Sequence, residues 1–374
     1  MNKTSKIYIA GHTGLVGSAI KRKLEGEGYT NLIFRTHAEL DLTRQTDVER
    51  FFEKEQPDYV FLAAAKVGGI LANSTYKAEF IYDNSMIASN IIHASYKSGV
   101  KKLLNLGSSC IYPRDCPQPM KEEYLLTGAL EPTNEPYAIA KIAAIKLCRY
   151  YNEQYGANFI SVMPTNLYGP NDNFDLQTSH VLPALIRKMH LGKCLGVGDV
   201  VAIRDDLKKY PLRIGDVPQM EEIRIIEALA RCGIKTDDTS RLTPHASRSV
   251  IVELWGTGAP YREFLHVDDL ARACLFLMEK HHAMHSAQSS VHAEGIGEFI
   301  NIGTGKDLKI RDLAQMIKDI VGFQGDITWD IDKPDGTPRK LLDVSKIKSV
   351  GWQPKIGLEE GIKKTYEWYL SQSA

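Results

Sequence analysis

A short β-rich run near the start of the chain, Lys6–Ala10, leads directly into a glycine turn, Gly11-His12-Thr13-Gly14-Leu15-Val16-Gly17. The following stretch, through Leu24, has the composition and the period of a helix. Glycine permits a tight turn at such a junction, and it lets backbone amides at the start of the helix approach a pyrophosphate group. Glycine triplets also serve as plain turns, but the order strand, turn, helix predicts a dinucleotide-binding site.

Strands and helices continue to alternate after this turn. We expect strands at residues 32–34, 59–63 and 102–107, with helices near residues 48–54 and 87–98. Alternation at this spacing indicates βαβ units and a doubly wound parallel sheet. The predicted fold class is α/β. We expect a Rossmann-type dinucleotide-binding domain at residues 1–180, with parts of the later chain returning to it, and a smaller, mainly substrate-binding α/β domain at residues 181–374.

The C-terminal half of the chain is less regular. We expect a strand and turn at residues 299–305 and a helix at residues 311–321. Residues 196–250 differ from their surroundings. They contain two expected helices, at residues 200–209 and 220–232, which are separated by Pro211, Gly215 and Pro218.

Composition and charge narrow the class of protein. The 46 basic and 46 acidic residues give no net charge, so nothing supports a nucleic-acid or membrane-surface role. We find no signal sequence and no apolar stretch near the ~20 residues of a membrane helix. The six scattered cysteines fit reduced thiols in the cytoplasm rather than a disulfide frame or a zinc site. We interpret the loop with His281, His282, His285 and His292 as solvated rather than metal-binding.

A tyrosine and a lysine, Tyr137 and Lys141, lie four residues apart in a stretch compatible with a helix. Four residues make about one turn, so both side chains point to the same face. A lysine near the cofactor would favour tyrosinate, and Tyr137 would donate a proton to a carbonyl oxygen as hydride arrives. Such a pair is often only a surface pair, but Ser108, just past a predicted strand, and the glycine turn complete a reductase centre.

The residues after the second predicted strand bear on the choice of cofactor. An acidic residue there would favour NAD by bonding the ribose hydroxyl, whereas this chain has Arg35. Its guanidinium can pair with a 2′-phosphate, which favours NADP, although a solvated arginine at a strand end would give the same pattern.

Six segments of the chain carry a resemblance to a known family. They are residues 62–69, 107–113, 135–141, 164–170, 262–269 and 333–340. On these segments the chain resembles the extended short-chain dehydrogenase/reductases, and among them the bifunctional epimerase–reductases of GDP-4-keto-6-deoxy sugars. The resemblance covers nearly the whole chain except residues 196–250. Cys110, two residues after Ser108, is its most specific mark.

The resemblance implies 3,5-epimerisation of GDP-4-keto-6-deoxy-D-mannose and then NADPH-dependent reduction at C4, which yields GDP-L-fucose. A C4 ketone acidifies the hydrogens on C3 and C5, so one base and one acid on opposite faces can invert both centres through enolates. The resemblance assigns the base to Cys110 and the acid to His180. Tyr137 would protonate the oxygen, Ser108 would hydrogen-bond the carbonyl, and Lys141 would hold the ribose and tune Tyr137.

The same resemblance implies a set of ligand contacts, and a homodimer formed through the helices that flank the tyrosine–lysine pair. The implied cofactor residues are Gly11, His12, Thr13, Gly14, Leu15, Val16, Gly17, Arg35, Asp41, Ala63, Ala64, Leu106, Gly107, Lys141, Pro164, Asn166, Leu167 and His180. The implied substrate residues are Asn166, Lys188, Trp255, Arg262, Asp335 and Lys340. Basic side chains suit a pyrophosphate, and an aromatic ring suits stacking.

Two departures from the family leave alternatives open. The family commonly has arginine where this chain has Thr13 and His37, so NAD is a weaker alternative to NADP. Residues 196–250 form an insertion between Lys188 and Trp255, and we expect them beside the nucleotide-sugar cleft. They would act as a lid, an altered sugar pocket or an oligomer contact, or they are a tolerated surface insertion.

Other functions compete with this interpretation. The nearest is the same chemistry on a GDP-4-keto-6-deoxy-heptose, which would use the same catalytic residues. A non-catalytic NADP-binding regulator would be favoured by the loss of a catalytic side chain, but all five are present. A 4,6-dehydratase or a UDP-hexose 4-epimerase would keep the tyrosine–lysine pair without needing Cys110 together with His180.

Overall fold

The computed structural model describes residues 1–212, 221–237, 248–283 and 295–372. The chain folds into two compact units. Unit 1 comprises Met1–Asn171, Glu263–Lys306 and Leu341–Ile356, and unit 2 comprises Asp172–Arg262, Asp307–Lys340 and Gly357–Ala374. Among the helices of the described residues, none has the length and apolar character needed to cross a membrane.

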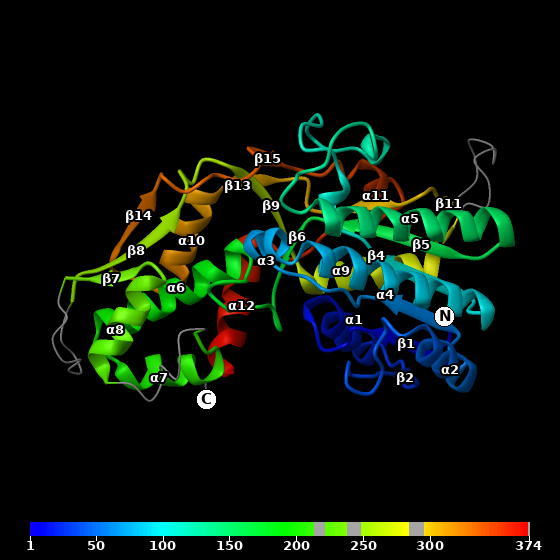
Figure 1. Ribbon diagram of the computed structural model, residues 1–374, viewed down its shortest axis with the longest axis horizontal. Coiled ribbons are helices and arrows are strands. Elements are labelled where there is room, and N and C mark those ends of the chain that lie inside the picture. The colour runs from blue at the N-terminus through cyan, green and yellow to red at the C-terminus, as the bar shows by residue number, and fades with distance from the viewer. Residues whose placement is uncertain (213–220, 238–247, 284–294, 373–374) are drawn as a thin grey trace. The chain divides into compact units, whose positions relative to one another are not determined.

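Unit 1 is built on a six-stranded sheet with the strand order β12-β5-β4-β3-β1-β2, in which every pairing is parallel (Figure 1). The strands are β1 (Ile7–Ala10), β2 (Leu32–Ile33), β3 (Tyr59–Leu62), β4 (Lys102–Leu106), β5 (Phe159–Pro164) and β12 (Ile300–Ile302). Every residue of β1, β4, β5 and β12 is buried. A parallel sheet covered on both faces requires such continuous apolar strands. The predicted doubly wound α/β fold is confirmed.

Alternate residues of β1 point to opposite faces of this sheet, and each face has its own apolar core. Ile7 and Ile9 join the core that includes Leu24 of α1, whereas Tyr8 joins the core that includes Phe52 of α2. The helices of unit 1 are α1 (Leu15–Gly26), α2 (Gln45–Glu55), α3 (Ile70–Thr75), α4 (Lys77–Lys97), α5 (Glu135–Tyr155), α9 (Val267–Lys280) and α11 (Ser345–Ser349). The helices expected near residues 48–54 and 87–98 are thus present and longer than predicted.

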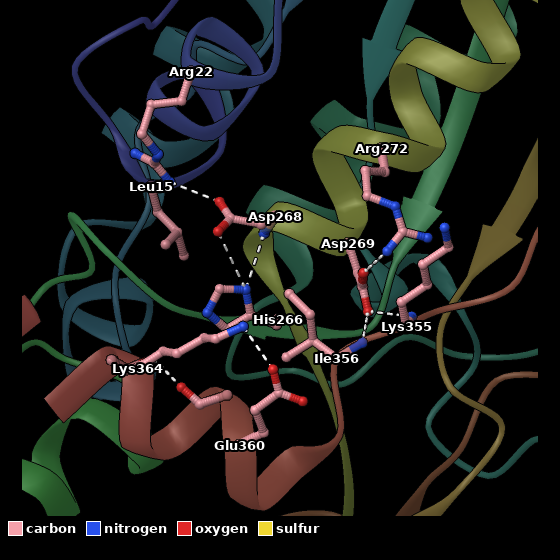
Figure 2. A network of polar contacts seen from close by, with 12 residues as sticks. Leu15, Arg22, His266, Asp268, Asp269, Arg272, Lys355, Ile356, Glu360 and Lys364 are labelled. Atoms are coloured by element: carbon pink, nitrogen blue, oxygen red, sulfur yellow. Dashed lines mark hydrogen bonds and ion pairs between the residues drawn. The ribbon is translucent and has the colours of Figure 1, made fainter. Parts of the chain in front are cut away.

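An ion pair and two hydrogen bonds from backbone amides tie α9 to other parts of unit 1 (Figure 2). Arg22 of α1 pairs with Asp268 at 2.8 Å, and the ring of His266 accepts a hydrogen bond from the Asp268 amide at 3.2 Å. The buried carboxylate of Asp269 pairs with Arg272, and it accepts hydrogen bonds from the backbone amides of residues 355 and 356 at 2.9 and 2.8 Å. Segments that are far apart in the sequence are therefore connected to one another through α9.

Unit 2 contains a three-stranded sheet in the order β14-β8-β7 (Figure 1). The central strand β8 (Val250–Trp255) pairs parallel with β14 (Asp326–Asp330) and antiparallel with β7 (Ile234–Thr236). The helices of unit 2 are α6 (Val181–Gly196), α7 (Val200–Lys209), α8 (Glu222–Arg231), α10 (Ile310–Val321) and α12 (Leu358–Ser371). The helix predicted at residues 311–321 corresponds to α10.

Short strands complete the two units. In unit 1, β6 (Asn166–Tyr168) pairs parallel with residues 264–266 of β9 (Tyr261–His266), and β10 (His282–Ala283) pairs parallel with β11 (Gly295–Ile296). In unit 2, β15 (Arg339–Lys340) pairs parallel with residues 261–262 of β9. The strand β13 (Asp307–Lys309) is also a neighbour of β9.

The predicted insertion has regular structure where it is described. Its first helix, α7, has the predicted bounds, and α8 lies within the second predicted helix. The strand β7 was not predicted, because three residues are too few to show a period without knowledge of β8. Gly215, Pro218, His285 and His292 lie outside the described residues. Within the described part, no group of three or more His, Cys, Asp or Glu side chains could hold a metal ion.

Candidate active site

The glycine turn between β1 and α1, Gly11–Gly17, leaves no room for side chains at two of its glycines. A Cβ atom on Gly17 would lie 2.0 Å from the Gly11 carbonyl oxygen, and one on Gly11, where φ is +83°, would lie 2.8 Å from the backbone of Ala64. Gly14 is the N-cap of α1, and no described side chain caps this helix end. The amides at the start of α1 therefore remain available to a pyrophosphate, so the turn fits a dinucleotide.

Two basic side chains follow β2, and they differ in their contacts and in their exposure to solvent. The guanidinium of Arg35 already pairs with Glu55 at 2.7 Å and donates to the Phe34 carbonyl at 2.6 Å. His37 is 83% exposed, and its ring lies 4.0 Å from Asp41, which itself accepts hydrogen bonds from Thr43. Arg35 would have to share its charge between Glu55 and a 2′-phosphate.

Sequence reasoning missed a further cation beside this turn. Lys21 lies one helical turn after Gly17 on α1, and its ammonium lies 4.8 Å from the centre of the Phe34 ring. That ring is 5.1 Å from the His12 ring. Desolvation, followed by the charge of Lys21, lowers the pKa of the His12 imidazole. The sequence alone could have pointed to Lys21, because it follows Gly17 by four residues, which is about one helical turn.

The strand β4 and the helix α5 bring the predicted reductase residues together. The Ser108 hydroxyl, just past β4, accepts a hydrogen bond of 3.4 Å from the amide of Cys110, whose thiol is buried. The Lys141 ammonium donates to the carbonyl of Leu106 at 2.7 Å and lies 5.7 Å from the centre of the Tyr137 ring. Lys141 is thus bonded to β4, the strand that immediately precedes Ser108. Its side chain lies on the same face of α5 as that of Tyr137.

Burial dominates the electrostatics of this group. It raises the pKa of the Tyr137 hydroxyl, and the charge of Cys110 raises it further. It lowers the pKa of Lys141 to about 8, against the opposing effect of Cys110. The effect of Lys141 on tyrosinate stays a prediction. Burial keeps Tyr137 protonated at neutral pH, so its hydroxyl is suited to donate a proton.

Seven other predicted cofactor residues lie at or shortly after the carboxyl ends of β3, β4 and β5. Ala63 and Ala64 follow β3, Leu106 ends β4 and Gly107 follows it, and Pro164 ends β5, with Asn166 and Leu167 opening the short strand β6 two residues later. A Cβ atom on Gly107 would lie 2.0 Å from the Met163 side chain, and Asn166 donates to the Glu263 carbonyl at 2.8 Å. Dinucleotides bind at this edge of doubly wound sheets.

In unit 2, the structure gathers four of the predicted substrate residues, Trp255, Arg262, Asp335 and Lys340, which we call the substrate surface. Trp255 ends β8 and is 67% exposed. The Asp335 carboxylate accepts hydrogen bonds from the amide and hydroxyl of Thr257, two residues further on, at 2.9 and 2.6 Å. Lys340 is the partner of Arg262 in the β15–β9 pairing, and the charge of Asp335 acts on Arg262.

Lys188, the fifth predicted substrate residue of unit 2, lies against the insertion. Its ammonium donates to the Glu253 carbonyl at 3.1 Å, and a Cβ atom on Gly233 would lie 3.1 Å from it. Burial lowers the pKa of Lys188. Gly233 separates α8 from β7, so the insertion directly borders a predicted substrate contact.

His180, the predicted acid, is the N-cap residue of α6. Its carbonyl accepts a hydrogen bond of 3.1 Å from the Ala184 amide. Desolvation, followed by the positive charge of Lys340, lowers the pKa of its imidazole. A lower pKa makes the protonated ring a stronger acid.

The chain is similar to known proteins over most of its length. The chain matches the sequence model of the NAD dependent epimerase/dehydratase family over residues 7–208 and 224–303. It is 51% identical to GDP-L-fucose synthase 1 of Arabidopsis thaliana, covering 99% of this chain and 94% of that protein. It is 47% identical to GDP-L-fucose synthase of Escherichia coli (strain K12), covering 98% and 96%.

Solved structures give similar matches. A GDP-6-OMe-4-keto-L-xylo-heptose reductase from C. jejuni is 42% identical, with a TM-score of 0.87 and coverage of 100% of this chain and 99% of that one. A GDP-mannoheptose C4 reductase from Campylobacter jejuni with NADP bound is also 42% identical, with a TM-score of 0.79 and coverage of 99% of both chains.

Proposed function

This chain belongs to the NAD dependent epimerase/dehydratase family, and from that premise we propose that it is a bifunctional epimerase–reductase. It would convert GDP-4-keto-6-deoxy-D-mannose to GDP-L-fucose by inverting C3 and C5 and then reducing C4. The proposal is supported by relatives named GDP-L-fucose synthase that are about half identical over nearly the full chain. The observation that carries it is the buried Cys110, whose amide is bonded to the Ser108 hydroxyl just past the strand to which Lys141 is bonded.

A thiol at the reductase centre has a specific use in this chemistry. Inversion requires that a proton leave C3 or C5 on one face and return on the other. We assign removal to the Cys110 thiolate, which leaves an enolate conjugated with the C4 oxygen. We assign return to the protonated ring of His180. Two such cycles invert both centres without oxidation or reduction.

The second half of the reaction uses the tyrosine–lysine pair. When bound, the nicotinamide cofactor supplies the hydride to C4. Tyr137 donates its proton to the C4 oxygen, and Ser108 hydrogen-bonds the same oxygen. Lys141, held on Leu106, would orient the ribose. Hydride and proton together convert the ketone to the alcohol.

We propose NADPH as the preferred cofactor, with NADH as the weaker alternative. The glycine turn would hold the pyrophosphate, and Arg35 with Lys21 would face the 2′-phosphate. No acidic residue occurs in residues 32–38 to bond a ribose hydroxyl. The NADP-bound heptose reductase is consistent with this preference.

We further propose a homodimer formed through α4 and α5, because large side chains on these helices are exposed, including Tyr82, Ile139 and Tyr150. Unit 2 would bind the nucleotide sugar. None of the six cysteines, all of which lie in the described residues, forms a disulfide, and the mechanism needs Cys110 reduced, so we expect the protein in the cytoplasm.

Incubation of the protein with the ketosugar in deuterated water tests the proposal. With NADPH, NMR should show GDP-L-fucose with deuterium at C3 and C5. The variant Cys110→Ser should lose this deuterium while still binding NADPH, and Cys148→Ser, which changes a different buried cysteine, should retain it. Absence of both exchange and NADPH oxidation in the unaltered protein would refute the assignment.

A second substrate has specific support. Two solved relatives act, by their names, on GDP-linked heptoses, and the insertion of this chain contacts Lys188. The alternative is therefore the same chemistry on a GDP-4-keto-6-deoxy-heptose. A higher kcat/KM for the heptose than for the hexose would replace the first proposal.

A further inference from the structure

A buried arginine joins the insertion to the helix that follows His180. Arg187 of α6 is fully buried, and its Nε and Nη2 atoms donate to one oxygen of Asp206 at 2.9 and 2.8 Å. Asp206 is also fully buried and belongs to α7 of the insertion. Buried charges are costly to desolvate, so this pair depends on complete hydrogen bonding.

The remaining bonds of the pair reach two other segments of unit 2. Arg187 donates through Nη1 to the Phe174 carbonyl at 3.0 Å and through Nη2 to the Tyr210 carbonyl at 2.5 Å. The Tyr369 hydroxyl of α12 donates to the second oxygen of Asp206. One ion pair thus connects α6, α7, α12 and the segment that precedes His180.

Aromatic packing fixes that preceding segment at its base. Phe174 is buried, with its ring centre 4.8 Å from that of Tyr369, 5.7 Å from Tyr210 and 6.1 Å from Trp368. The rings of Tyr210 and Tyr369 are themselves stacked, with an interplanar angle of 7°. Phe174 is therefore held both by its backbone carbonyl, on Arg187, and by its ring.

A rigid turn leads from Phe174 to His180. The Asp175 carboxylate accepts hydrogen bonds from the amides of Gln177 and Thr178 at 2.8 and 2.9 Å, and the Asp175 carbonyl accepts one from the Ser179 amide at 2.9 Å. The next residue is His180, which opens α6. Arg187 lies seven residues later, about two turns along the same helix. Because it belongs to α6 and also bonds the Phe174 carbonyl, it connects the segments that precede and follow His180.

We propose that Arg187 and Asp206 are positioning residues for His180, and that through them the insertion sets the epimerisation step. The inference rests on the proposed function of His180 as the acid. Neutralising Asp206 leaves the Arg187 charge buried and unbalanced, so the guanidinium must move, and the Phe174 carbonyl and the turn move with it. A displaced acid slows proton return at C3 and C5, whereas hydride transfer to C4 uses Tyr137 and is spared.

The ratio of epimerised to unepimerised product tests this proposal. In Asp206→Asn, deuterium incorporation at C3 and C5 should fall roughly tenfold to a hundredfold, the effect of a displacement near 1 Å. C4-reduced sugar that lacks inversion should then accumulate. The matched control is Asp205→Asn, an exposed neighbour on α7 that pairs with Lys208, and it should leave the product ratio unchanged.

A purely structural role predicts a different result. Loss of folded protein lowers epimerisation and reduction in proportion, so a lower melting temperature with an unchanged product ratio overturns the proposal. If Asp206→Asn does not fold, Tyr369→Phe serves instead, because it keeps the ion pair and removes one donor to Asp206. It should shift the product ratio in the same direction by a smaller factor, and an unchanged ratio in this folded variant overturns the proposal.

Hydrogen exchange of backbone amides tests the positioning role of Asp206 separately from the proposed function. Hydrogen exchange of the Thr178 and Ser179 amides should accelerate in Asp206→Asn but not in Asp205→Asn. If the unaltered protein is inactive on the hexose and the heptose, the proposed function fails, and the exchange data still decide whether Asp206 holds this turn. Unchanged protection of these amides overturns the positioning role.

Discussion

The glycine turn of unit 1 and the substrate surface of unit 2 are built in different ways. The glycine turn consists of backbone, and all of its essential residues lie within Gly11–Gly17. The substrate surface consists of long side chains from separate segments, joined by contacts such as those between Asp335 and Thr257. The glycine turn leaves no room for an added atom at Gly11 or Gly17, whereas a side-chain site can change its specificity by single replacements. The four predictions below test this difference, from the largest expected effect to the smallest.

Two alanine substitutions in the glycine turn should differ sharply. Gly17→Ala places a Cβ atom 2.0 Å from the Gly11 carbonyl oxygen, and backbone must shift to admit it. We expect it to lower the free energy of unfolding by about 3 kcal/mol and to abolish NADPH binding. In Gly14→Ala the same distance is 3.6 Å, so the loss should stay below about 1 kcal/mol. Denaturant unfolding measures both, and equal losses would contradict a steric origin.

Removal of the exposed ring in the substrate surface should affect binding rather than folding. Trp255→Ala should weaken GDP binding by about 1–3 kcal/mol, the usual contribution of an aromatic ring stacked on a base. The melting temperature should change little, because the ring is 67% exposed. Ile223→Ala removes an exposed apolar side chain of α8 as the control. Calorimetric titration with GDP checks the pair, and equal affinities would remove Trp255 from the substrate surface.

A side chain next to the glycine turn should tune cofactor choice. Lys21→Gln removes the ammonium that lies over the Phe34 ring, so we expect the KM for NADPH to rise by about fivefold to tenfold. The KM for NADH should not change, because NADH lacks the 2′-phosphate. Lys23→Gln, whose lysine pairs with Glu27, is the control on the same helix. A parallel rise for both cofactors would show that Lys21 acts on the fold and not on the phosphate.

Lys141 is a buried charge of unit 1, and it should make the free energy of unfolding depend on pH. Burial lowers its folded-state pKa to about 8, below the unfolded value of about 10.4. Between these values the unfolded chain binds the proton and the folded protein does not, so this group's contribution to the free energy of unfolding rises with pH. Relative to Lys141→Met, the protein should gain up to about 1 kcal/mol per pH unit from pH 8 to 10.

Chemical denaturation at pH 8, 9 and 10 gives this difference. Subtraction of the Lys141→Met values removes the titration of other buried groups, such as Cys148, whose pKa burial raises. A constant difference across this range would mean that the folded-state pKa of Lys141 is not lowered.

Local features of both units were predictable from the sequence. The order of β1, glycine turn and α1 follows from residues within twenty positions of each other, because sterics at glycine act over a few bonds. The bounds of α7 were also correct, since the helical period of residues 200–209 is contained in the segment itself. The positions of Tyr137 and Lys141 on one helix face depended only on their spacing.

Long-range contacts were not predictable. Arg187 and Asp206 would be exposed on isolated helices, and only the packing of α12 and Phe174 around them makes both fully buried. The sequence indicated that Arg35 can pair with a 2′-phosphate, but it did not indicate the ion pair between Arg35 and Glu55, twenty positions later. The strand β7 exists because β8 offers it an edge, which a three-residue sequence cannot reveal.

The sequence by itself determined the glycine turn and the placement of Tyr137 and Lys141 on one helix face, because local sterics and helical geometry convert residue identity and short spacing directly into structure. The roles of Ser108, Cys110 and the substrate surface were implied by the resemblance to a family. Only the tertiary structure decided how charges are paired and desolvated, including Lys141 on Leu106, Lys188 beside Gly233, and Arg187 on Asp206. Electrostatic energies depend on every neighbour within several ångströms, and those neighbours are brought together by folding alone.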